Sequence, residues 1–353
     1  MSTEGPRYTP KEMLARLVGF DTVSHKSNLA LIAFVEDYLA AHGIASKRVP
    51  NTDGDKAGLY ATIGPNVDGG VVLSAHSDVV PTEHQTWTTD PFTLTELGSR
   101  LYARGTSDMK GFLACALALV PEFAAADLAT PIHLAISYDE EVGCMGCHDM
   151  VREMAEGGIA PPRGVIVGEP TEMQLVVAHK GIDAFETVVT GKETHSSQTQ
   201  LGANAIMAAG SLIGELQRLA DRAQEAAPAD SPFTPPYSTL SVGTIEGGHA
   251  LNIVPGSCRF VWECRTLPGD DPQAFVQALD RYARDTVLPR LHASAPEAAI
   301  ATTRRAGVTA LAPETGPQAA AEGVPPARRG QAEALARQLT GTNRTEAVSY
   351  ATE

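Results

Sequence analysis

The sequence lacks three features that would assign it to whole classes of protein. No uninterrupted apolar run approaches the roughly 20 residues that a membrane-spanning helix needs. The first residues, MSTEGPRYTPKEMLARL, contain no basic segment followed by an apolar one, so no export signal is predicted. Basic residues are also scarce, with 27 Lys and Arg against 42 Asp and Glu, and the net charge of −15 argues against nucleic acid. We therefore expect neither a membrane nor a nucleic-acid partner.

Cysteine is the next scarce residue. The five cysteines are an odd number, scattered through 353 residues, which fits reduced thiols in a cytoplasm better than a disulfide framework. Two of them, in Cys144-Met-Gly-Cys147-His148, match the C-x-x-C-H pattern of covalent haem attachment, but the export signal which that reaction requires is missing. A redox pair is a second interpretation. Two buried thiols at the start of a helix over Met145–Glu156 are the favoured one.

Hydrophobic periodicity predicts two kinds of domain. In the first half, expected helices alternate with apolar strands, which predicts an α/β domain whose mostly parallel sheet is covered by helices on both faces. The expected helices are Lys11–Phe20, Leu29–His42 and Gly111–Phe123, and the expected strands are Leu59–Gly64, Gly70–Ala75, Pro131–Tyr138 and Gly164–Gly168.

The pattern changes near Lys180. A β-α-β-β-α-β order follows, typical of a ferredoxin-like α+β domain. Its expected elements are strand Asp183–Thr190, helix Gly202–Arg222, strand Ser238–Ile245, a strand pair around Leu251–Leu267, helix Asp271–Val287 and a weak strand at Ala299–Arg304. We therefore expect a catalytic domain from residues 1–180 and 309–353, with residues 181–308 inserted as a lid and dimerisation domain.

Three consecutive carboxylates, Asp139-Glu140-Glu141, end the apolar run in AISYDEEVGC. Because like charges repel, such a cluster is either a solvated turn or a site where a divalent cation offsets the repulsion. For the three acids alone, the turn is the simpler interpretation.

Other expected strands also end in metal-binding types of residue. His76 and Asp78 lie two apart after one strand and so share a face, Asp108 precedes a helix, and Glu169 follows a further strand. Taken singly, they are explained by a structural histidine, a helix cap and a loop acid. Together they favour a shared site, because the carboxyl ends of strands in an open α/β sheet form the ligand crevice.

The motifs SAHSDVVP, RGTSDMKG, SYDEEVGC and VGEPTEM jointly resemble the co-catalytic zinc amidohydrolases, and the similarity extends from Leu14 to the end of the chain. The resemblance implies two divalent metals, zinc or alternatively cobalt or manganese. It implies that His76 binds the first metal, that Asp108 bridges both, that Glu169 completes the first site and that Glu141 binds the second.

The same resemblance implies the remaining roles. Glu140 is implied as the general base and Asp78 as the residue that orients His76. His195, in Thr194-His195-Ser-Ser197, resembles a lid histidine that stabilises the oxyanion in the partner protomer, which implies a homodimer. Asn252 and Arg265 match lid positions that hold the substrate carboxylate, and a surface arginine on a strand is the less favoured alternative for Arg265.

The substrate is implied by four longer passages. GFDTVSHKSNLALIAFVEDYL, DPFTLTE, HKGIDAFETVVTG and PPYSTLSVGTIEGGHALNIVPG are most similar to the acetylornithine deacetylase branch, which implies hydrolysis of N-acetyl-L-ornithine in arginine biosynthesis. Deacylases of succinyl-diaminopimelate or of other acyl amino acids are the alternatives.

The family pattern breaks at the end of the sequence. Relatives continue beyond a motif like SYATE to a late histidine ligand of the second metal, whereas here only His249 and His292 follow His195. We therefore expect an incomplete second site and one tightly bound ion. A truncated chain, a naturally short chain and a substitute ligand all remain open. A catalytically inactive binding relative is a further alternative, against which Glu140 argues.

Overall fold

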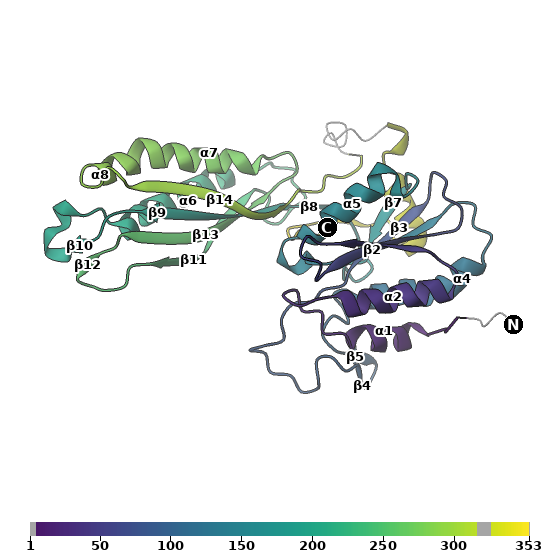
Figure 1. Cartoon of the computed structure of the whole chain (residues 1–353). Helices are drawn as coiled ribbons and strands as arrows, with labels where there is room; N and C mark the ends of the chain where they lie inside the picture. The colour runs from purple at the N-terminus through teal and green to yellow at the C-terminus, as the bar shows by residue number, and fades with distance from the viewer. Residues whose placement is uncertain (1–4, 316–325, 353) are drawn as a thin grey trace. The chain divides into compact units, whose positions relative to one another are not determined.

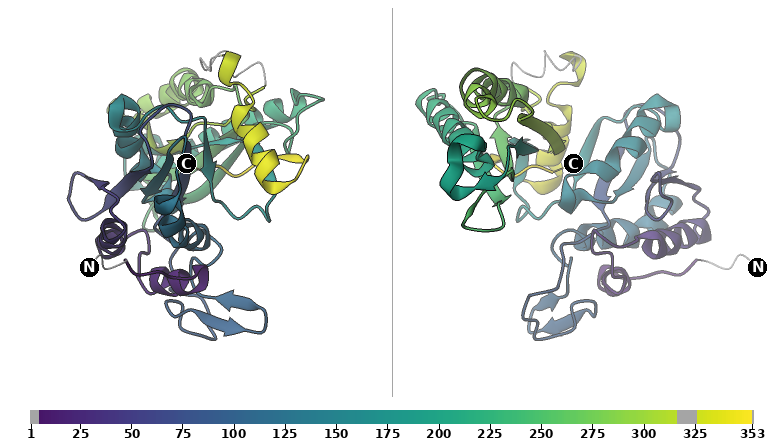
Figure 2. Two further views of the ribbon diagram at one scale, coloured as in Figure 1. Left: turned by 90° about the vertical axis from the view of Figure 1, so that its right-hand side faces the viewer. Right: turned by 60° about the vertical axis from the view of Figure 1, so that its left-hand side comes forward.

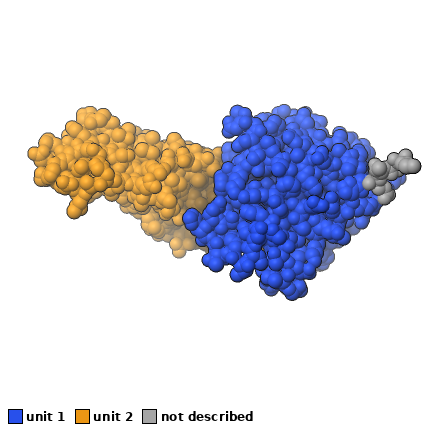
Figure 3. All heavy atoms as spheres, turned by 60° about the horizontal axis from the view of Figure 1, so that its bottom comes forward, with its two compact units in different colours: residues 1–175, 324–344, 352–353 blue, residues 176–323, 345–351 orange. Residues whose placement is uncertain are grey.

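The computed structural model describes residues 5–315 and 326–352, which form two compact units. Unit 1 comprises residues 1–175, 324–344 and 352–353, and unit 2 comprises residues 176–323 and 345–351 (Figure 3). The inserted domain was expected over residues 181–308, whereas unit 2 begins five residues earlier, ends fifteen residues later and also includes residues 345–351. No helix in the described ranges has the length and apolar character needed to cross a membrane.

Unit 1 is built on a five-stranded sheet of mixed direction (Figure 1). Its strand order is β1-β2-β6-β3-β7, with β1 Ser46–Pro50, β2 Ala57–Ile63, β6 Ile132–Ser137, β3 Val71–His76 and β7 Gly164–Val167. The expected α/β class is confirmed, but only β6-β3-β7 is parallel. Strand β2 pairs antiparallel with both β1 and β6. The short turn between β1 and β2 requires this direction, because a parallel pair needs a long crossover.

Helices cover both faces of this sheet. The core on one face includes buried residues of α1 Pro10–Val18, α2 Leu29–Ala41, α3 Lys110–Ala118 and α4 Val120–Ala125, and the other core includes Met150 of α5 His148–Glu153. Within β6, Leu134 and Ile136 belong to the first core and Ala135 to the second. The single helix expected over Gly111–Phe123 is divided at Leu119, and the next helix begins at Val120 with Pro121 in its first turn.

Three further elements of unit 1 were not expected from the sequence. They are β4 Thr95–Leu97 and β5 Arg100–Tyr102, which form a hairpin that projects from the unit (Figure 2), and α10 Gln331–Thr340, which packs on β7. The helix expected over Met145–Glu156 is α-helical only in α5, because a 3-10 turn, Met145–Cys147, precedes it.

Unit 2 contains a four-stranded antiparallel sheet in the order β11-β13-β9-β14. Its elements follow the chain as β9 Gly181–Thr190, α6 Ala205–Glu225, β11 Thr239–Gly247, β13 Ser257–Thr266, α7 Pro272–Tyr282, α8 Leu288–His292 and β14 Ala299–Val308. This connectivity confirms the ferredoxin-like expectation. Alternate residues of β13, among them Phe260 and Trp262, are buried against α6 and α7, as expected for a sheet with one covered face.

Short strand pairs complete unit 2. Strand β10 Thr194–His195 pairs with β12 Ile253–Val254, and β8 Leu175–His179 pairs with β15 Thr345–Val348. The long strand pair expected around Leu251–Leu267 is therefore two separate elements, β12 and β13.

Candidate metal centre

The carboxyl ends of three neighbouring parallel strands assemble the candidate site in unit 1. Strand β3 ends at His76, β6 leads into the acidic turn Asp139-Glu140-Glu141, and β7 leads to Glu169. Asp108 lies two residues before α3. The adjacency of β6, β3 and β7 explains why residues almost a hundred positions apart in sequence meet at one edge of the sheet.

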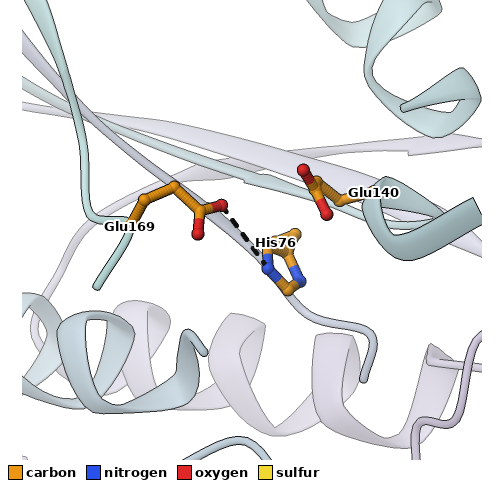
Figure 4. A group of neighbouring side chains, drawn as sticks. All are labelled: His76, Glu140 and Glu169. Carbon is orange, nitrogen blue, oxygen red and sulfur yellow. Dashed lines mark ion pairs between the residues drawn. The ribbon is translucent and has the colours of Figure 1, made fainter. Parts of the chain in front are cut away.

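Two groups of side chains have the spacing of metal ligands. His76, Glu140 and Glu169 form one group (Figure 4), and His76, Asp108 and Glu141 form the other, with the ligand atoms of each group within 4.8 Å of one another. The resemblance implied His76, Asp108 and Glu169 as one set. The structure instead places Asp108 and Glu169 in different groups and adds Glu140 as a candidate ligand.

His76 is fully buried and its two ring nitrogens have different surroundings. Nδ1 lies 2.9 Å from the backbone carbonyl oxygen of Asp78, and Nε2 lies 3.0 Å from Oδ1 of Asp108 and 3.8 Å from Oε1 of Glu169. In a neutral ring, an Nδ1–H donating to the Asp78 carbonyl leaves the Nε2 lone pair directed at the carboxylates. This is the usual arrangement of a metal-binding histidine.

Asp78 contacts the acidic turn through its carboxylate. The carboxylate accepts hydrogen bonds from the backbone N–H groups of Glu140 (3.2 Å) and Glu141 (3.4 Å) and from the hydroxyl of Ser24 (2.7 Å). Its Oδ1 is 3.5 Å from Nδ1 of His76, farther than its own carbonyl oxygen. Asp78 thus connects the histidine to the backbone of the two glutamates.

The electrostatics of the cluster are those of crowded acids. Burial, together with the neighbouring Asp108 carboxylate, raises the pKa of Glu141 to about 7. Burial also raises the pKa of Glu169. Burial of His76 opposes its protonation, but the hydrogen-bonded carboxylates of Asp108 and Asp78 outweigh it and raise the pKa of the ring to about 11. The cluster therefore favours positive charge at its centre.

Thr352 is a member of the site that the sequence did not reveal. Its hydroxyl donates a 2.9 Å hydrogen bond to Oε1 of Glu169. A hydroxyl in an irregular tail carries no periodic signal, and only the motif around it, SYATE, drew attention at the sequence level.

The three remaining predicted site residues belong to unit 2 and are not all close together. His195 is exposed, and its strand β10 pairs with β12, next to Asn252, whose carbonyl accepts from the N–H of Ser196. Arg265 lies near the far end of β13 and forms an ion pair with Glu263 at 3.1 Å. At about 3.4 Å per residue, the strand separates Arg265 from the His195 and Asn252 end by more than 20 Å.

Comparison with known proteins now identifies the family. Residues 177–290 match the peptidase dimerisation domain. The chain is 39% identical over 279 residues to acetylornithine deacetylase of Myxococcus xanthus, covering 78% of this chain and 71% of the relative. It is 36% identical to the acetylornithine deacetylase of Proteus mirabilis, covering 76% and 67%. The chain belongs to the acetylornithine deacetylase family of metal-dependent amidohydrolases.

A solved structure shares the fold of this amidohydrolase. An M20 family metallo-carboxypeptidase from Sulfolobus solfataricus superposes with a TM-score of 0.69 at 18% identity, over 98% of this chain and 86% of the other. This likeness shows the fold, and the two acetylornithine deacetylases confirm the expected family and the expected class of enzyme.

The residues of the amidohydrolase site fit a divalent metal. Carboxylate oxygens and one imidazole are ligands that zinc, cobalt and manganese accept. Within the described residues, His76 is the single imidazole of both ligand groups. His249 instead lies 3.6 Å from Glu193, and the ring of His292 contacts the carbonyl of Ala298, both in unit 2.

Cys144 and Cys147 follow the acidic turn of the amidohydrolase. Cys144 is buried, with its Sγ 3.7 Å from Oε1 of Glu140, and Cys147 Sγ lies 3.1 Å from the carbonyl of Cys144. Cys144 is thus packed against the candidate base.

Proposed function

We propose that this chain hydrolyses the amide bond of N-acetyl-L-ornithine to give L-ornithine and acetate, as a cytoplasmic step of arginine biosynthesis. The convergence of His76 with the carboxylates of three strand ends carries the proposal, in a chain similar to acetylornithine deacetylases. We propose His76, Asp108, Glu141 and Glu169 as the metal ligands, with zinc, cobalt or manganese as the metal. Divalent metal held there would polarise the substrate carbonyl and lower the pKa of water.

Glu140 performs the proton transfers in this proposal. Its carboxylate accepts a proton from the attacking water and donates it to the departing amine, which leaves as a neutral group. Asp78 supports this role, because its carboxylate holds the backbone N–H of Glu140 and thereby fixes where the side chain begins.

The substrate carries both charges that the proposed residues can recognise. The side-chain ammonium of ornithine is attracted by the acidic cluster, and the guanidinium of Arg265 offers a bidentate partner for the substrate carboxylate. His195 acts as an oxyanion donor. Asn252 binds the substrate beside it, since both residues lie at the β10–β12 end of unit 2. Arg265 acts separately, at the other end of β13.

A homodimer through unit 2 is part of the proposal. The match to a peptidase dimerisation domain supports it, as does the free edge of β11, where the exposed Ile245 leaves apolar surface to cover. In such a dimer, His195 would serve the partner protomer.

A substrate panel and metal analysis test the proposal together. The purified chain, loaded with zinc, is incubated with N-acetyl-L-ornithine, N-succinyl-diaminopimelate and N-acetylmethionine, and release of the amine is followed. We expect the highest kcat/KM with N-acetyl-L-ornithine. A preference for the succinyl substrate or for N-acetylmethionine would show that the chain is another deacylase of the family. Binding without turnover of any substrate would favour an inactive relative.

Metal stoichiometry is measured by equilibrium dialysis and elemental analysis on the same preparation. Because both ligand groups depend on the one ring of His76, we expect one tightly bound zinc per protomer and a second that is weaker. Two equally tight ions would show that the ligands rearrange beyond what these groups predict.

A further inference from the structure

The three consecutive acids do not share one environment. Glu140 and Glu141 belong to the candidate ligand groups, whereas Asp139 does not. The carboxylate of Asp139 instead accepts a 2.6 Å charged hydrogen bond from Nζ of Lys56, a residue that is 83 positions away in sequence and lies just before β2. Both side chains are mostly buried, at 13% exposed for Lys56 and 20% for Asp139. The ion pair is therefore largely shielded from solvent.

The backbone conformation of Asp139 sets the direction of the acidic turn. Asp139 has φ 58° and ψ 28°, in the left-handed region that aspartate tolerates better than most residues. The left-handed residue ends the extended path of β6 and starts the 3-10 turn Glu140–Val142, from which both glutamates project. Any movement of Asp139 therefore moves the origin of both side chains.

Lys56 also reaches the other support of the turn. Its Nζ donates to the backbone carbonyl of Ser24, and the Ser24 hydroxyl donates to the Asp78 carboxylate that holds the N–H groups of Glu140 and Glu141. Ser24 is 4% exposed and Asp78 is 2% exposed. One ammonium group thus connects the first residue of the acidic turn to the segment that carries the Asp78 hydrogen bonds.

We propose that Lys56 is a positioning residue for the catalytic base: by neutralising the charge of Asp139, it keeps the acidic turn in the conformation that aims Glu140 at the metal centre. The role rests on the proposed function of Glu140. It explains why three adjacent carboxylates are tolerated, since one of them is compensated by a buried cation and only two remain for the centre. Loss of Lys56 leaves a mostly buried carboxylate unpaired, which favours displacement of the turn toward water.

Lys56→Met tests the proposal, because it keeps the aliphatic stem and removes the charge. We expect kcat to fall about 10- to 100-fold, as for other displacements of a catalytic group, with KM changed less than about 3-fold. Lys47→Met is the matched control, since Lys47 lies in the same unit and forms an exposed 3.3 Å pair with Glu153. Its kcat should equal that of the unaltered enzyme.

The double variant Lys56→Met/Asp139→Asn separates positioning from general stability. Removing both charges removes the unpaired carboxylate, so kcat should recover to within about 3-fold of the unaltered enzyme even though the ion pair is gone. A double variant as slow as Lys56→Met would overturn the proposal. So would a correctly folded Lys56→Met enzyme with unaltered kcat.

Amide hydrogen exchange of residues 138–144 in the full chain distinguishes failure of this proposal from failure of the proposed function. Lys56→Met should raise exchange of the turn amides at least about 10-fold, and the double variant should reverse most of that rise. If the unaltered chain hydrolyses no N-acyl amino acid, the function of Glu140 is wrong, and the exchange result alone decides whether Lys56 holds the turn. Unchanged exchange in Lys56→Met would refute that role.

Discussion

Charged side chains are arranged differently in the two units. On the open face of the unit 2 sheet, carboxylates and guanidinium groups alternate across neighbouring strands: Arg259 of β13 pairs with Glu186 of β9 at 3.2 Å and with Glu246 of β11 at 2.8 Å. On the covered face of the same sheet, Arg304 of β14 pairs with Asp183 of β9, a buried residue two positions before Phe185. In unit 1, several carboxylates instead gather around the single ring of His76.

The two arrangements have different roles, because the paired charges stabilise a sheet and the clustered carboxylates can bind a ligand. Cross-strand pairs of opposite sign add modest stability and fix which strands are neighbours. A buried cluster of one sign lowers stability, and such clusters are typical of functional sites. Within unit 1, the Lys56–Asp139 pair is an example of the first kind beside a cluster of the second kind. It compensates the one acid of the turn that does not belong to the candidate ligand groups.

The largest effect is expected when the base of the uncompensated cluster is changed. Glu140→Gln should reduce kcat by about 100-fold or more, because general-base catalysis is lost while the backbone hydrogen bond to Asp78 remains. Zinc content should stay close to one per protomer. Steady-state kinetics with elemental analysis measure both, and Glu153→Gln, at an exposed site paired with Lys47, is the control. Near-normal turnover would show that another group takes the proton.

A comparably large effect is expected at the one proposed catalytic residue of unit 2. His195→Ala should lower kcat by up to about 100-fold, corresponding to roughly 3 kcal/mol of transition-state stabilisation, with a smaller change in KM. Heterodimers of His195→Ala with Glu140→Gln should regain part of the activity, since one site then has both residues. Absence of rescue in verified heterodimers would assign the histidine to its own protomer.

A moderate effect on stability alone is expected from breaking a compensated pair in unit 2. Arg304→Met leaves Asp183, whose side chain is 5% exposed, without its cation, and should lower the free energy of unfolding by about 1–3 kcal/mol. Urea unfolding of the full chain measures the change. Arg284→Met, at an exposed pair with Asp285, should change it by less than about 0.5 kcal/mol. A loss no larger than in this control would show that the Arg304–Asp183 pair stabilises unit 2 no more than an exposed pair does.

The last effect appears only below neutral pH and concerns His133, a buried histidine in the unit 1 sheet. His133 is fully buried, its Nδ1 lies 2.9 Å from the Thr62 hydroxyl, and burial lowers its pKa. The unfolded chain therefore binds a proton near pH 6.5 that the folded chain resists, so this stability is complete above that pH and is lost as the pH falls. His133→Gln should flatten the fall in unfolding free energy between pH 7 and 5 by at most about 1.4 kcal/mol per pH unit. An unchanged slope would show that His133 does not cause it.

The sequence predicted the strands with strong periodicity and the acids at their ends. β3, β6 and β7 were expected within one or two residues, and β9-α6-β11-β13-α7-β14 matched the ferredoxin-like order. Strand β1, SKRVP, was missed because it has little apolar pattern and a proline at its end. The direction of β2 was missed because residues 46–50 were not recognised as its hairpin partner.

The contacts that support the site were beyond the reach of sequence patterns. Ser24, Lys56 and Thr352 act over separations of 54 to 183 residues, and each contributes a single hydrogen-bonding group with no periodic neighbours. The sequence was enough to recognise that the acids share one site. It did not show which of them form each ligand group, because that depends on side-chain directions at strand ends. The position of Arg265 relative to Asn252 was missed for a related reason, since the length of β13 lies between them.

The pairing of β9 with β14 has a consequence for how the chain is assembled. Ile182 is opposite Val308, and His179 and Leu311 each donate a backbone N–H to the carbonyl oxygen of the other. The chain therefore leaves the inserted unit beside the point where it enters. More than a hundred residues therefore span almost no distance, and the closure entropy that they impose on the surrounding chain is that of a short connection. The four-stranded sheet of unit 2 can therefore be completed before α10, the last helix of unit 1, has been synthesised.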